Sequence, residues 1–199
     1  MSERFQNKYR IESTRLKHWD YGWNGSYFVT ICTRNRFYFF GDVVDGEMVL
    51  NDIGLIARDC WIQIPEHFPF VKLGNYVVMP NHVHGIVVID KPDNPVETPK
   101  LGVSTTTTTT TATNRTNAAS EKWNPGTLGV IINQYKRAVT IRARKIHVDF
   151  AWQSRFHDHI IRNDESFHRI SEYIINNPLN WSDDKFHLQI YIRFTNGEE

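Results

Sequence analysis

The amino-acid sequence predicts an α+β fold, and three observations support this prediction. Runs of β-branched and aromatic residues indicate strands at 27–33, 76–79 and 82–89, with a further extended segment at 150–161. Apolar residues recur with helical spacing near 53–61, 128–142 and 164–177. Asp45-Gly46, between two short apolar runs, is typical of a hairpin turn. The element order is compatible with a ferredoxin-like split βαβ antiparallel sheet, and we expect its helices on one face.

Single residues indicate where two of these helices end. Asn51 or Asp52 caps the first helix, and Pro65 ends it. Asn177 ends the last helix, because the residue before a proline, here Pro178, disfavours helical backbone. Asn177 is therefore expected on the last turn of that helix.

Length and composition describe one globular domain, residues 1–199. A hydrophobic share of 40% is ordinary for such a domain, and a net charge of +1 does not by itself indicate a nucleic-acid binder. Cys32 and Cys60 are expected to be reduced thiols of a cytoplasmic protein without a signal segment or membrane span. The polar, threonine-rich stretch at about 90–123 is expected to form a flexible loop or insertion, because it cannot bury enough apolar surface to offset its ordering entropy.

His82 and His84 are two residues apart on a predicted strand, so both imidazoles project from the same face. Val83 turns to the opposite face, and Ile86 and Val88 continue the histidine face, which indicates a central strand. Two neutral imidazoles side by side suit one divalent cation. The alternative, two incidental histidines, is favoured while the motif is considered in isolation.

A second pair with the same spacing, His157 and His159, competes for this role. Asp158 between them would face away from both imidazoles, which weakens it as a third ligand. A solvated strand edge with one buried histidine is the favoured interpretation of this segment.

Tyr173 and Asn177 are four residues apart on the last predicted helix and therefore share a face. A tyrosine hydroxyl can act as a nucleophile, and an amide oxygen is a hard ligand suited to Mg²⁺ or Mn²⁺. The alternative is that Tyr173 packs in the core and Asn177 merely terminates the helix.

A cluster of basic residues with interleaved aromatic side chains lies between positions 134 and 162. This combination is typical of surfaces that bind single-stranded nucleic acid, and a solvated helix face is an equal alternative. The basic residues, which are our candidates for DNA contacts, are Lys136, Arg137, Arg142, Arg144, Lys145, Arg155 and Arg162.

Three motifs, in this order, resemble the single-tyrosine HUH transposases of insertion sequences, and above all the REP-associated tyrosine transposases. The first strand and the histidine motif of that group resemble YFVTICTRNR (27–36) and VVMPNHVHGIVVI (77–89). Its C-terminal block resembles WQSRFHDHIIRNDESFHRISEYIINNPLNW (152–181). The resemblance covers most of the chain outside 90–123, where the threonine-rich segment departs from the group's pattern.

The resemblance implies a ferredoxin-like HUH transposase domain and suggests a role for several residues. His82 and His84 match the family's metal-binding histidines, Tyr173 matches its nucleophile, and Asn177 matches the polar residue one turn later. His159 matches a family histidine to which we assign only an accessory role. The implied cofactor is Mg²⁺ or Mn²⁺.

The activity that the resemblance implies is metal-dependent cleavage and rejoining of single-stranded DNA, in particular hairpin-forming repeats. Tyr173 would attack a phosphate, leaving a 5′-phosphotyrosine and a free 3′-OH, and another 3′-OH would reverse the step. Tyr135 is the rival nucleophile because it lies in a basic helix. The alternatives are a non-catalytic binder of structured DNA or RNA and a hydrolase that activates water. Both a monomer and a homodimer are compatible with the resemblance.

Overall fold

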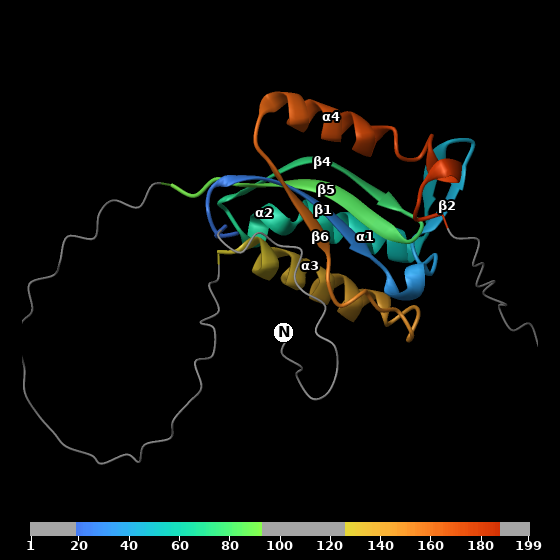
Figure 1. Ribbon diagram of the computed structural model, residues 1–199. Helices are drawn as coiled ribbons and strands as arrows, with labels where there is room; N and C mark the ends of the chain where they lie inside the picture. The colour runs from blue at the N-terminus through green and yellow to red at the C-terminus, as the bar shows by residue number, and fades with distance from the viewer. Residues whose placement is uncertain (1–18, 93–125, 188–199) are drawn as a thin grey trace, which may run out of the picture.

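The computed structural model describes residues 19–92 and 126–187, and a four-stranded sheet forms its centre (Figure 1). The strand order is β4-β5-β1-β6, and each neighbouring pair is antiparallel. The four strands are β1 (Gly25–Cys32), β4 (Val71–Met79), β5 (His82–Ile89) and β6 (His157–Ile161).

Two helices make the long connections of this sheet. The helix α1 (Asp52–Ile62) lies between β1 and β4 in the chain, and α3 (Leu128–Ala143) lies between β5 and β6. In each case a third strand separates the two strands that the helix connects, so both units are split βαβ motifs. Interlocking of the two units produces the ferredoxin-like sheet, and the predicted fold class is confirmed.

Helices cover both faces of the sheet, so the expectation of helices on one face is wrong. The helices α1, α3 and the short α2 (Ile64–His67) lie on one face, and α4 (Asp164–Ile175) lies on the other (Figure 1). The main core, which includes Trp61 and Tyr27, lies on the α1 and α3 side. The physical reason for α4 is that β5 is apolar on both faces, and Ile86 on its second face also requires a cover.

The α4 face has its own small core. Ile86, Ile161 and Ile174 are buried together there, with Phe28 and Phe167 packed against them. Burial of one such side chain stabilises the fold by about 1.5–3 kcal/mol. This contact holds α4, and with it the predicted nucleophile, against the strand that carries the histidines.

The first helix ends before the proline that we expected to terminate it. Asn51 is its N-cap, and Asn51 Oδ1 accepts a hydrogen bond from the Gly54 amide at 2.9 Å, as predicted. The helix ends at Ile62, and Pro65 lies in the first turn of α2. A proline is tolerated there because the first helical N–H groups have no partner within the helix.

Three other boundaries also differ from those predicted. The helix α4 ends at Ile175, so Asn177 lies just beyond it rather than in its last turn. The strand β4 begins at Val71, before the predicted start at Tyr76. The prediction missed its first half because the pairing is irregular between Leu73 and Tyr76, which interrupts the alternation of side chains. Only the last part of the extended segment at 150–161 forms a strand.

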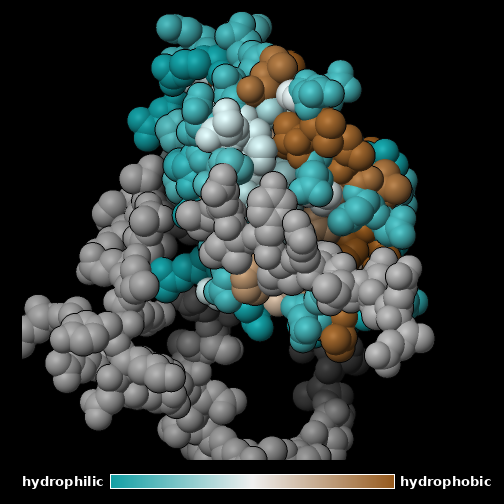
Figure 2. Space-filling model, turned by 90° about the vertical axis from the view of Figure 1, so that its right-hand side faces the viewer, coloured by the Kyte–Doolittle hydropathy of each residue, from teal (hydrophilic) through white to brown (hydrophobic). Residues whose placement is uncertain are grey.

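The predicted hairpin consists of β2 (Gly41–Val44) and β3 (Glu47–Leu50), joined at Asp45-Gly46. A Cβ on Gly46, where φ is +78°, would come within 2.7 Å of Leu179 Cδ2, so the turn packs against the segment that follows α4. Figure 2 looks onto this end of the molecule and shows hydrophobic residues gathered on its surface. The exposed hydrophobic residues of the hairpin, of the last turn of α4 and of the segment that follows it are Val44, Val49, Ile175 and Leu179.

Some predictions on chain organisation fall outside these elements. The threonine-rich stretch lies almost wholly outside the described residues. Cys32 and Cys60 are both buried and unpaired, as expected. Among residues 19–92 and 126–187, no helix has the length and hydrophobicity needed to cross a membrane.

Candidate metal and tyrosine site

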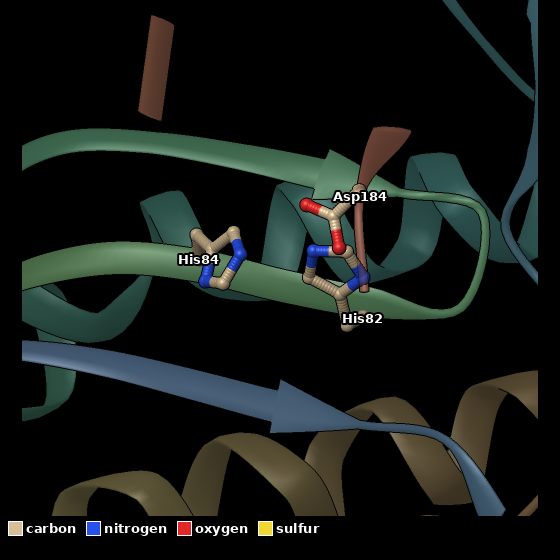
Figure 3. A group of neighbouring side chains, drawn as sticks. All are labelled: His82, His84 and Asp184. Carbon is tan, nitrogen blue, oxygen red and sulfur yellow. The ribbon is translucent and has the colours of Figure 1, made fainter. Parts of the chain in front are cut away.

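His82 and His84 begin β5 and project from the face that α4 covers. Both side chains are fully buried, with exposed fractions of 0% and 1%, and their ring centroids are 4.4 Å apart. The carboxylate of Asp184, from the segment after α4, lies beside them (Figure 3). One ligand atom from each of these three residues lies within 4.8 Å of the other two, which is the geometry of a candidate metal centre.

The Nδ1 atom of each histidine is held by an oxygen from the surrounding structure. His82 Nδ1 lies 2.8 Å from Asn81 Oδ1, and His84 Nδ1 lies 2.9 Å from Thr30 Oγ1. Thr30 is the register partner of His84 on β1, so the antiparallel pairing brings its hydroxyl to the ring. Hydrogen bonds of this kind fix the orientation of metal-binding histidines and direct Nε2 toward the ion.

Burial keeps both imidazoles neutral. It lowers the pKa of His82 well below its usual range, and the neighbouring His84 adds to this effect. Burial also lowers the pKa of His84 to about 3, with a smaller contribution from the Lys185 charge. At neutral pH both rings therefore have a free nitrogen lone pair, which a metal ligand requires.

Tyr173 projects from α4 toward the histidines. Its hydroxyl lies 3.3 Å from His84 Nε2, and its ring packs edge-on against Phe28 at a centroid distance of 6.2 Å. The side chain is 43% exposed, so the hydroxyl is not sealed in the core. Burial raises the pKa of Tyr173, the Asp184 carboxylate raises it further, and the Asn177 amide partly opposes both. The phenol is thus protonated in the metal-free protein at neutral pH.

Asn177 lies at the centre of the site although it follows the end of α4. It is 2% exposed, and its Nδ2 donates to Asp184 Oδ2 at 3.2 Å. Asn177 Oδ1 and His82 Nε2 are both buried and have no hydrogen-bond partner among the described residues. An unsatisfied buried polar atom costs about 1–3 kcal/mol, and a cation held between these two atoms would satisfy both.

The four polar side chains fit a divalent cation. His82 and His84 offer neutral nitrogen atoms, Asn177 offers an unpaired amide oxygen, and Asp184 offers a carboxylate beside both histidines. Imidazole and oxygen ligands together suit first-row divalent ions such as Mn²⁺, and hard oxygen ligands suit Mg²⁺. The donor set is consistent with the implied cofactor without selecting one of these ions.

A pocket of about 680 Å³ opens beside His84 and Tyr173. Three basic residues, Arg36, Arg155 and Lys185, contribute to its lining. The aromatic side chains Phe28, Phe156 and Phe186 line it as well. Surfaces that bind single-stranded nucleic acid combine these two features, since basic side chains hold the phosphates and aromatic rings stack on the bases.

The seven predicted DNA-contacting residues do not form one patch. Arg155 lines the site pocket, and Arg162 is exposed at the end of β6. Arg137 and Arg142 instead line a second pocket, between α3 and the α1–α2 segment, on the opposite face of the sheet. The others lie along α3 or just after it, where Lys136 and Arg144 donate to the backbone carbonyls of Gln153 and Phe150.

Tyr135 lies away from the site, whereas the second histidine pair lies at its edge. Tyr135 is 2% exposed in the main core, where its hydroxyl donates to the Ala57 carbonyl at 3.2 Å. The Tyr135 hydroxyl is therefore enclosed in the core, whereas the Tyr173 side chain is 43% exposed. His157 and His159 are exposed on the edge strand β6 and share the histidine face, and His157 lines the site pocket.

Asp184 is the main site residue that the sequence did not reveal. It lies in a short polar segment after the Tyr173 block, and an isolated acid there carries no recognisable spacing. Arg36 and Lys185 were also missed, because their approach to the pocket depends on how the chain after α4 folds back. That return is visible in the hydrogen bond from an Arg36 guanidinium nitrogen to the Lys185 carbonyl at 3.0 Å.

The chain shares its ferredoxin-like fold with a REP-associated tyrosine transposase. The structure of a REP-associated tyrosine transposase bound to a REP hairpin matches 88% of this chain and 77% of its own, with a TM-score of 0.50 and 18% sequence identity. At this identity the likeness establishes the fold alone. By sequence, the chain belongs to the same family as an uncharacterized protein of Haemophilus influenzae, to which it is 37% identical over 177 residues, 88% of this chain and 92% of that protein. No family model matches the chain.

Proposed function

We propose that this protein is a metal-dependent transposase that cleaves and rejoins single-stranded DNA through Tyr173. The observation that supports this most is the position of the Tyr173 hydroxyl, 3.3 Å from a buried histidine of the candidate metal centre. A nucleophile next to a candidate metal centre, in a pocket lined by basic residues, is an arrangement suited to phosphoryl transfer through a covalent intermediate. The related structure contains a REP hairpin, and hairpin-forming repeats are therefore the DNA that we propose as substrate.

In the proposed reaction, Tyr173 Oη attacks a phosphorus atom of the DNA backbone. A bond forms between Oη and phosphorus, the bond from phosphorus to the 3′-oxygen breaks, and the phenol loses a proton while the departing 3′-oxygen gains one. The 5′-phosphotyrosine conserves the phosphodiester, so another 3′-OH can reverse the step and join two ends. No separate energy source is needed.

The remaining residues of the site bind and orient the reacting groups. His82, His84, Asn177 and Asp184 would hold Mg²⁺ or Mn²⁺, which when bound supplies positive charge to offset the charge on the phosphate. Arg155 lines the pocket, where its guanidinium can hold a neighbouring phosphate. Phe28 packs against both the His84 and the Tyr173 rings and so fixes the phenol over the histidine face.

The test uses single-stranded hairpin DNA from repeats flanking the gene, labelled on either side of the cleavage site, with Mn²⁺ or with EDTA. Wild-type protein is expected to carry the 3′-side fragment on a denaturing gel only when the metal is present. Tyr173→Phe should bind the DNA without forming the adduct, and Tyr135→Phe, whose hydroxyl lies in the core, serves as the matched control that still forms it. Cleavage without a protein-linked fragment would instead indicate a hydrolase. Binding without cleavage would indicate a non-catalytic binder.

A further inference from the structure

Asn81, in the turn between β4 and β5, uses every hydrogen-bonding group of its side chain. Its Oδ1 lies 2.8 Å from His82 Nδ1, and its Nδ2 donates to the Phe186 carbonyl at 2.8 Å and to the Arg36 carbonyl at 3.2 Å. The residue is fully buried. An asparagine at a turn usually serves only the local backbone, whereas this one connects three separate segments.

These contacts determine which nitrogen of His82 carries the proton. Because Asn81 Nδ2 donates to two carbonyl groups, it is Oδ1 that faces the ring, and an amide oxygen can only accept. His82 Nδ1 must therefore be the donor. The lone pair of the neutral ring is then on Nε2, the atom that has no partner among the described residues.

The same amide also positions the segment that carries Asp184. Asn81 Nδ2 holds the carbonyl of Phe186, and the Phe186 amide donates to Asp184 Oδ1 at 2.6 Å. The Phe186 ring lies against His82 at a centroid distance of 4.7 Å. One side chain thus links two of the candidate ligands, a histidine at the start of β5 and a carboxylate beyond the end of α4.

We infer that Asn81 is a positioning residue of the metal centre, which sets the tautomer of His82 and holds Asp184 within reach of the same ion. This inference rests on the proposed metal-dependent function. Asn81 would act on the metal ion only through His82 and Asp184, and would not bind the ion itself. Loss of such an outer hydrogen bond weakens metal binding by about tenfold to a hundredfold.

The test compares Asn81→Leu and Asn81→Asp with the wild type, and Thr33→Val is the matched control. Thr33 is also fully buried and bonds the Asn81 backbone carbonyl, but its hydroxyl is not a partner of the His82 ring. Nitrogen-15 NMR of the metal-free proteins reports the His82 tautomer, and calorimetry with Mn²⁺ alone reports the affinity. If Asn81→Leu does not fold, Asn81→Ala replaces it.

The wild type and Asn81→Asp, which keeps the acceptor, are expected to carry the His82 proton on Nδ1, whereas Asn81→Leu loses this preference. Asn81→Leu should bind Mn²⁺ about tenfold or more weakly, and Thr33→Val should bind it like the wild type. A His82 proton on Nε2 in the wild type, or an unchanged affinity in Asn81→Leu, would overturn the inference. Absence of Mn²⁺ binding by the wild type would count against the proposed function, and the tautomer of His82 could still be compared between variants.

Discussion

The phenol oxygen of Tyr173 lies 3.3 Å from Nε2 of His84, although the two residues are 89 positions apart in the chain. The contact exists because α4 covers the second face of the sheet, the face from which the histidines project. The small core beneath α4 is therefore part of what positions the nucleophile. The stability of that core and the geometry of the site should change together.

Ile174→Ala tests this connection between packing and the site. Ile174 follows Tyr173 in α4, and its side chain is fully buried between this helix and the sheet. Its truncation is expected to lower the free energy of unfolding by about 2–5 kcal/mol. Ile175→Ala is the matched control, because Ile175 is 60% exposed and its truncation should cost less than about 0.5 kcal/mol. Urea unfolding followed by fluorescence measures both. Equal losses in the two variants would show that α4 is not held as described.

Asn177→Ala tests the amide oxygen as a ligand. Asn177 Oδ1 is buried without a partner among the described residues, so its removal should weaken Mn²⁺ binding by about tenfold or more. Binding can be followed by thermal shift, because an ion at a hundred times its dissociation constant stabilises the folded state by about 2.7 kcal/mol. Asn176→Ala, which changes the exposed neighbour, should leave the shift unchanged. A full shift in Asn177→Ala would exclude this residue from the ligand set.

Asp184→Asn tests the ligand that the sequence did not reveal. The substitution keeps the shape of the side chain but removes the negative charge beside both histidines, so Mn²⁺ affinity should fall by about tenfold or more. The same change should lower the pKa of Tyr173, because the Asp184 carboxylate raises it in the metal-free protein. Ultraviolet titration of the phenol in EDTA measures this second effect. Asp183→Asn, on the exposed neighbour, is the control for both measurements.

The buried histidines make the stability of the metal-free protein depend on pH. Burial lowers the pKa of His84 to about 3, whereas an unfolded histidine titrates near 6.5. Below about pH 6.5, His84 therefore binds a proton in the unfolded chain but stays neutral in the folded chain. The free energy of unfolding consequently falls as the pH falls. One such group contributes up to about 1.4 kcal/mol per pH unit. Urea unfolding in EDTA at about pH 6 and pH 5 should give a smaller slope for His84→Asn than for the wild type, and equal slopes would contradict the account.

Arg155→Ala tests the basic wall of the site pocket. If Arg155 contacts a phosphate, its loss should weaken single-stranded DNA binding and reduce the salt dependence by about 0.7 in the log–log slope. Arg137→Ala is the comparison, because Arg137 lines the pocket on the opposite face of the sheet. Fluorescence anisotropy across a salt series measures both variants. An equal loss in Arg137→Ala would mean that the DNA extends to the far face.

The sequence predicted the histidine face of β5 because strand alternation is a local rule. His82, His84 and Ile86 share one face of the strand and Val83 lies on the other, and their spacing in the sequence is sufficient to predict both assignments. The order of the elements, together with the resemblance, was sufficient to predict the ferredoxin-like sheet. The prediction placed α4 on the wrong face of the sheet. The sequence of one strand shows which of its faces are apolar, but it does not show which helix covers each face.

The parts of the site that were missed depend on how distant segments meet. Asp184, Arg36 and Lys185 come together because the chain after α4 returns to the start of β5, and no local spacing encodes that return. The predicted basic patch was divided for a similar reason. Arg137 and Arg155 are close in the sequence and were therefore predicted to form one surface. In the structure, the sheet lies between the two pockets that they line.

Mapping the covalent bond tests the central claim most directly. The protein would be incubated with a single-stranded hairpin substrate and Mn²⁺, digested with nuclease and protease, and analysed by tandem mass spectrometry. The account predicts a 5′-linked nucleotide on Tyr173, present with Mn²⁺ and lost in EDTA. A nucleotide on any other residue, or cleaved DNA with no modified peptide, would contradict it.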